Sequence, residues 1–126
     1  MLPGGRAESR QGVAPWIFDG YAPVSGVVTT NQDLATFATA MLRGKVPGLS
    51  ALTPLADADD ADQRIGCFWV SSTVGEDRRR IVWHNGMTGG YAAFVGFDLE
   101  RGRAIVVLSD VAKEVDRLGL RLLTAA

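Results

Sequence analysis

Residues 79–97 read RRIVWHNGMTGGYAAFVGF, and this stretch decides the fold. Apolar positions alternate with polar or small ones on both sides of a glycine-rich centre, which indicates strands over residues 79–84 and 91–97. The turn Thr88-Gly89-Gly90 between them is too short to hold a crossover helix. The stretch therefore predicts an antiparallel hairpin, with His84 at the end of its first strand.

Two further strand-like runs flank this hairpin, over residues 65–73 and 103–109. Turn-forming residues separate the neighbouring runs, at positions 75–77 and 100–102. Because every connection is short, consecutive strands are expected to pair antiparallel. Residues 65–109 should therefore form an antiparallel meander.

A helix is predicted over residues 30–43. Thr30 is followed three residues later by Asp33, the spacing of a capping box, and Gly44 stands where a helix C-cap is expected. The apolar residues recur at helical spacing, at Leu34, Phe37, Ala38, Met41 and Leu42. This segment should form an amphipathic helix ahead of the sheet.

A second helix is predicted over residues 111–123, capped by Asp110. Its expected apolar face consists of Val111, Val115, Leu118 and Leu122. The fold class is therefore α+β: an antiparallel meander sheet, a C-terminal helix packed on it and an N-terminal amphipathic helix.

The remaining segments look irregular. Residues 1–28 are rich in glycine and proline, and residues 45–63 are expected to form a loop with a short helical turn near residues 49–52. At 126 residues the whole chain, 1–126, has the size of a single unit. Cys67 is the only cysteine, which excludes an internal disulfide, and we expect it in the core.

Composition excludes several classes of partner. The 13 basic and 14 acidic residues nearly cancel, and the basic run Arg78-Arg79-Arg80 is best read as a solvated hairpin end, so nucleic acid is not an expected partner. No apolar run approaches the roughly 20 residues of a membrane span. The aspartates of residues 57–62 lack the glycine and the final glutamate of a calcium loop. No metal or cofactor site is predicted.

Four motifs in this order resemble the C-terminal part of the serine β-lactamase-like superfamily. That superfamily includes class C β-lactamases, penicillin-binding D-alanyl-D-alanine peptidases and related esterases. The motifs are the serine- and threonine-rich lead at residues 25–30 into the first helix, IGCFW at 65–69, HNGMTGGY at 84–91 and IVVLSD at 105–110. The resemblance implies the corresponding part of a β-lactamase/transpeptidase-like fold.

The resemblance also implies roles for four residues. His84, Asn85 and Gly86 fall on the family's Lys-Thr/Ser-Gly strand motif, which has a histidine version in many esterase-like members. His84 would then be a hydrogen-bond donor or proton relay, with Asn85 and Gly86 as substrate-binding positions. The backbone N–H of Met87 would be one of two oxyanion-hole donors. This histidine version favours ester or amide substrates, and the asparagine weakens the case for a substrate carboxylate.

The family's nucleophile is missing from this sequence. None of its serines has a lysine three residues later, and neither tyrosine begins a Tyr-x-Asn element. We therefore expect the C-terminal piece of a longer serine hydrolase, inactive alone, whose partner is the N-terminal part of the same polypeptide. An isolated piece should expose a sheet edge and self-associate. The alternatives are a non-catalytic binding module of the same fold and an unrelated α+β domain in which His84 is a core residue.

Overall fold

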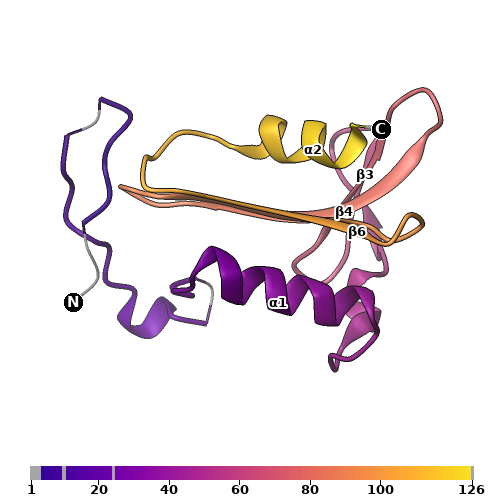
Figure 1. Cartoon of the computed structure of the whole chain (residues 1–126), viewed down its shortest axis with the longest axis horizontal. Coiled ribbons are helices and arrows are strands. Elements are labelled where there is room, and N and C mark those ends of the chain that lie inside the picture. Colours follow the sequence, from indigo (N-terminus) through magenta and orange to yellow (C-terminus); the bar gives the residue numbers. More distant parts are fainter. Residues whose placement is uncertain (1–3, 10, 24, 126) are drawn as a thin grey trace.

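The protein is an antiparallel sheet with one helix on each face (Figure 1). The computed structural model describes residues 4–9, 11–23 and 25–125. Its six strands lie side by side in chain order, and every neighbouring pair is antiparallel. The strands are β1 (Ala56–Asp57), β2 (Gln63–Ile65), β3 (Val70–Val74), β4 (Arg79–Met87), β5 (Ala92–Asp98) and β6 (Arg103–Ser109). The predicted α+β meander is thus confirmed.

Helix α1 (Asn31–Leu42) begins and ends as its sequence predicts. The Thr30 Oγ1 atom accepts a hydrogen bond from the Asp33 backbone N–H at 3.1 Å. Gly44 follows the helix with a φ of 65°, a left-handed conformation that glycine adopts without strain. Ala38 and Met41 are buried against the sheet and Leu42 packs beside them, whereas Phe37, which was predicted on the same face, is 41% exposed.

Helix α2 (Asp116–Thr124) begins five residues later than the sequence predicts. The backbone of residues 110–112 is already bonded to Arg6: the Arg6 N–H donates to the Asp110 carbonyl at 2.8 Å, and the Ala112 N–H donates to the Arg6 carbonyl at 2.8 Å. This pairing holds the segment extended, so the predicted Asp110 cap is wrong. The helix N-cap is Val115, which makes no side-chain cap bond.

The buried face of α2 also differs from the predicted one. Gly119 and Leu123 are buried, whereas Leu118 and Leu122 are 50% and 42% exposed. A Cβ atom at Gly119 would overlap the Phe94 ring. The absence of a side chain at Gly119 therefore lets the helix approach the sheet, and this contact decides which face turns inward.

Residues 65–73 form a hairpin in place of the single predicted strand. β2 ends at Ile65, β3 begins at Val70, and the Gly66 N–H donates to the Trp69 carbonyl at 2.8 Å to close the turn between them. Cys67 lies on this turn and is exposed, which corrects the expected core position. The expected loop at 45–63 contains the predicted short helix, η2 (Leu49–Leu52), but also strand β1 and the start of β2.

The middle of β4 joins two hydrophobic clusters on opposite faces of the sheet. Val82 packs with the α1 cluster, which includes Ala38, Met41 and Phe97. Ile81 and Trp83 pack on the other face with the α2 cluster of Phe94 and Leu123. Even-numbered side chains of β4 thus point to the α1 face, and odd-numbered ones point to the α2 face. β4 itself continues three residues beyond its predicted end, to Met87.

A buried ion pair fastens one end of the sheet. The Asp98 side chain is 1% exposed and lies 3.6 Å from Nη1 of Arg79, whose side chain is 12% exposed. Arg79 also donates through Nη2 to the Thr124 carbonyl at the end of α2, at 3.1 Å. The pair therefore links the β3–β4 and β5–β6 turns to the second helix.

Asp98→Ala should lower the free energy of unfolding by roughly 2 kcal/mol, because Arg79 would lose its buried partner and keep only the half-exposed Asp77, 2.8 Å from its Nε atom. Asp57→Ala is the matched control: it removes an ion pair whose side chains are 54% and 88% exposed. That change should cost less than about 1 kcal/mol. Urea unfolding followed by tryptophan fluorescence measures both losses, and equal losses would contradict the prediction.

Candidate active-site strand

The last four residues of β4 have a free edge. β3 pairs with β4 only as far as the register pair Val70–Trp83. On the other side, β5 pairs with β4 through to Met87. Within the described residues, positions 84–87 therefore have a strand neighbour on one side alone. The predicted site residues His84, Asn85, Gly86 and Met87 are the four residues of this free edge.

The orientation of the backbone at this edge follows from the turn that ends the strand. The Thr88 N–H donates to the Tyr91 carbonyl at 2.9 Å, so the backbone polar groups of Thr88 point toward β5. Successive residues of a strand direct these groups to alternate sides. The N–H groups of Asn85 and Met87 are therefore directed outward, at the free edge. A Cβ atom at Gly86 would meet nothing within 4 Å.

His84 projects from the α1 face of the sheet, which it shares with Val82 two residues earlier. Its side chain is exposed. The imidazole contacts the indole of Trp69 edge-on, with ring centroids 6.2 Å apart, and Trp69 in turn contacts Phe97 at 5.5 Å. Among the described residues, His84 thus has aromatic support on one side and is otherwise exposed.

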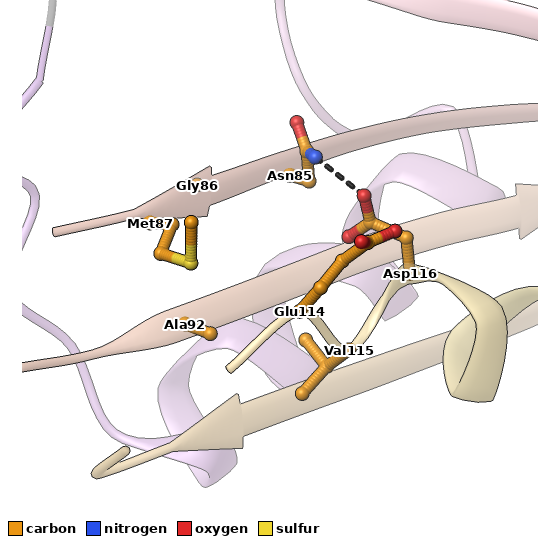
Figure 2. A pocket seen from close by; sticks show the side chains of 7 residues that line it. All are labelled: Asn85, Gly86, Met87, Ala92, Glu114, Val115 and Asp116. Atoms are coloured by element: carbon orange, nitrogen blue, oxygen red, sulfur yellow. Dashed lines mark hydrogen bonds between the residues drawn. The ribbon is translucent and has the colours of Figure 1, made fainter. Parts of the chain in front are cut away.

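Asn85 projects from the opposite face. Its Nδ2 group donates to the Oδ2 atom of Asp116 at 2.6 Å, which joins the free-edge segment to the first turn of α2 (Figure 2). The structure therefore separates the side chains of His84 and Asn85 across the sheet. On its α2 face a hollow of about 220 Å³ is lined by Asn85, Gly86, Met87, Ala92, Glu114, Val115 and Asp116. The Met87 side chain belongs to this hollow and is 61% exposed.

Burial raises the pKa of the Asp116 carboxyl above its ordinary value. The hydrogen bond from Asn85 opposes this shift by favouring the charged form, and the neighbouring charge of Glu114 adds to the shift. The Asn85–Asp116 bond therefore stabilises a carboxylate that its surroundings disfavour. This bond ties the strand to α2 on the face opposite His84.

Trp69 and Asp116 were not predicted as parts of this site. Trp69 lies fifteen residues before His84, and Asp116 lies 31 residues after Asn85, so no local spacing connects either pair. The corresponding sequence signal was the order of the motifs, which placed IGCFW ahead of the histidine strand. The order of the motifs indicated that IGCFW belongs near the histidine strand, but it did not predict the contacts of Trp69 or Asp116.

The described residues contain neither a metal-binding cluster nor a membrane-spanning helix. Among them, no group of three or more histidine, cysteine, aspartate or glutamate side chains could hold a metal ion. No helix in the described part of the chain is long and apolar enough to cross a membrane. What the edge does offer is a single imidazole, two outward backbone N–H groups and a glycine without obstruction.

Comparison with known proteins identifies the family of this chain. A family model described as Beta-lactamase matches residues 2–126. The chain therefore belongs to the β-lactamase family. A search of curated proteins found no match.

Two solved structures have the same fold. One is a class C β-lactamase with a TM-score of 0.78 and 15% sequence identity, and the match covers 97% of this chain and 42% of that one. The other is a tyrosine-to-phenylalanine mutant of a class C β-lactamase, with a TM-score of 0.71, 14% identity and coverage of 91% and 40%. The chain thus spans about two fifths of the length of these enzymes.

Asp116→Asn should remove a pH-dependent cost to stability. Because the folded state raises the pKa of Asp116, the wild-type protein loses stability as the pH rises from about 3.9, the ordinary value for aspartate, through the raised value. The variant has no such group and keeps its bond acceptor for Asn85. Its free energy of unfolding, relative to wild type, should therefore rise over this range and then stay constant.

Urea unfolding at pH 4 and pH 7 measures that difference. Asn85→Ala serves as the second variant, because loss of its hydrogen bond raises the Asp116 pKa further and should steepen the loss of stability with rising pH. A difference between wild type and Asp116→Asn that is the same at both pH values would refute the assignment.

Proposed function

We propose that this chain supplies the substrate-flanking strand of a serine hydrolase that transfers acyl groups from esters, amides or β-lactams. The observation that carries the proposal is the free edge of β4, which has His84 on one face and the N–H of Met87 directed outward. Family membership supports the reaction class. Because the chain spans about two fifths of the matched enzymes, the remaining catalytic groups are assigned to residues outside 1–126.

The proposed reaction has two steps. A serine Oγ from outside this chain attacks the substrate carbonyl and its proton passes to a base; the C–O or C–N bond then breaks as the leaving oxygen or nitrogen takes up a proton, and in a β-lactam that nitrogen stays attached to the opened ring. Water then attacks the acyl-serine ester, which releases the acid and restores the serine. In both steps negative charge gathers on the carbonyl oxygen, and the Met87 N–H would donate to it.

The other free-edge residues have distinct proposed roles. His84 would donate a hydrogen bond or relay a proton on the α1 face. Gly86 lets a substrate approach the strand backbone without a side chain in the way. Asn85 was expected to bind substrate, and its outward N–H supports that role for the backbone. Its side chain is occupied by Asp116 on the other face.

A non-catalytic binding module is the second candidate. The observation that favours it is the free edge combined with the missing Ser-x-x-Lys and Tyr-x-Asn elements. An open strand edge binds extended peptides by adding a strand, without any nucleophile. In this case the same outward N–H groups would hold a ligand and release it unchanged.

Covalent labelling separates these two functions. An antibody against this chain recovers the natural polypeptide from its source, and the sample is treated with a fluorophosphonate and with a fluorescent penicillin. We expect one labelled serine, in a Ser-x-x-Lys element, when the labelled polypeptide is mapped by peptide mass spectrometry. A polypeptide that contains residues 1–126 and takes neither label would instead indicate the binding module.

His84→Ala in the labelled polypeptide should slow labelling by a factor of about 10² to 10⁴, the usual contribution of a positioned acid or base. Arg80→Ala is the matched control, because Arg80 is an exposed residue of the same strand, on the same face, within the part that pairs with β3. The control should label at the wild-type rate. Equal rates for wild type and His84→Ala would refute a role for His84.

A further inference from the structure

The β2–β3 turn holds an aromatic residue in a conformation that favours glycine. Cys67 and Phe68 are its two central residues, between the Gly66 N–H and the Trp69 carbonyl that close it. Phe68 has a φ of 65°. A positive φ at the second central residue of such a turn usually requires glycine, because a Cβ atom is strained there.

Packing within the described residues does not compensate for this strain. The Phe68 side chain is 79% exposed, so little of its apolar surface is removed from water. Glycine at this position would relieve the strain and lose almost no packing. Strained residues of this kind concentrate at functional sites, where their geometry serves recognition.

The turn stands where the free edge of β4 begins. Val70, the first residue of β3, pairs with Trp83, so the residues that precede it lie beside the start of the segment 84–87. Trp69 confirms this placement by its ring contact with His84 at 6.2 Å. Phe68 is therefore the exposed neighbour of the residue that supports the histidine.

The chemistry of the turn favours an apolar ligand group. Residues 65–75 contain no charged side chain, and Ile65 is also exposed, at 47%. A substrate carboxylate or phosphate would find no cation in this segment. A hydrocarbon or aromatic group would find apolar surface on the turn beside the free edge.

We propose that Phe68 is a specificity-determining residue that contacts the apolar group of the substrate next to the reacting carbonyl. This inference rests on the proposed acyl-transfer function and adds the substrate class: esters or amides with a bulky hydrocarbon or aromatic acyl group. Trp69 would act as a positioning residue, since it touches His84 and anchors the turn on Phe97.

The test compares two p-nitrophenyl esters, the acetate and the hexanoate, in the polypeptide that carries the labelled serine. Phe68→Gly should lower kcat/KM for the hexanoate by about tenfold or more and change the acetate less than about twofold, since apolar contacts to added methylenes are lost. Its Tm should equal or exceed that of wild type, because backbone strain is relieved. Phe68→Leu should keep the preference for the hexanoate.

Arg78→Gly is the matched control. Arg78 has a φ of 49° and is exposed, but it lies in the β3–β4 turn, at the end of β4 remote from His84. Its replacement relieves similar strain and should leave the ratio of the two esters unchanged. The control therefore separates relief of strain from loss of a substrate contact.

Three outcomes would overturn the inference. If neither ester is hydrolysed and no serine is labelled, the proposed function fails and takes the inference with it. If wild type hydrolyses both esters but Phe68→Gly leaves their ratio unchanged, the inference alone fails. A lower Tm for Phe68→Gly, with both esters affected equally, would show that Phe68 packs against another part of the polypeptide.

Discussion

Strand β4 is held unequally along its length, and the candidate site depends on this difference. Over residues 81–83 it pairs with strands on both sides, and its side chains are buried on both faces of the sheet. Over residues 84–87, within the described chain, it pairs with β5 alone. Because the strand is continuous, its buried half fixes the backbone of its open half. An edge with preset geometry binds a ligand backbone at a lower entropic cost than a mobile loop does.

The two-residue period of the strand gives neighbouring residues separate tasks. His84 faces α1 and solvent, beside Trp69, whereas Asn85 faces α2 and bonds to Asp116. The free edge is therefore held by a hydrogen bond on the α2 face, opposite the face from which His84 projects. The raised pKa of Asp116 shows that this support has an electrostatic cost, which the bond from Asn85 partly offsets. The hydroxyl of a serine or threonine at position 85 would reach less far toward Asp116 in α2 than the Asn85 amide does.

Local chemistry explains which features the sequence predicted. The Thr30–Asp33 cap and the hairpin of residues 79–97 follow from short-range spacing, and both are found. The start of α2 was wrong because it depends on Arg6, about a hundred residues away, which holds residues 110–112 extended. The turn at 66–69 was missed because Phe68 occupies a position where turn rules expect glycine. The contacts of Trp69 with His84 and of Asp116 with Asn85 join residues far apart in the sequence. The motifs therefore predicted the strand, but its side-chain partners could be found only in the folded structure.

The arrangement of charge suggests how the free edge would discriminate between ligands. On the α2 face, the negative charges of Glu114 and Asp116 lie beside the positive charges of Lys113 and Arg117, with the sheet between these groups and His84. On the α1 side, the uncharged segment 65–75 runs beside the open strand. Recognition there would consequently rest on backbone donors and apolar contact, not on a fixed cation. Hydrogen-bond donors fix where a carbonyl sits, whereas apolar contact distinguishes ligands by the size of the attached group. The predicted placement of His84 at the family's lysine position is consistent with this division, because an imidazole can donate a hydrogen bond without imposing a permanent charge on the ligand.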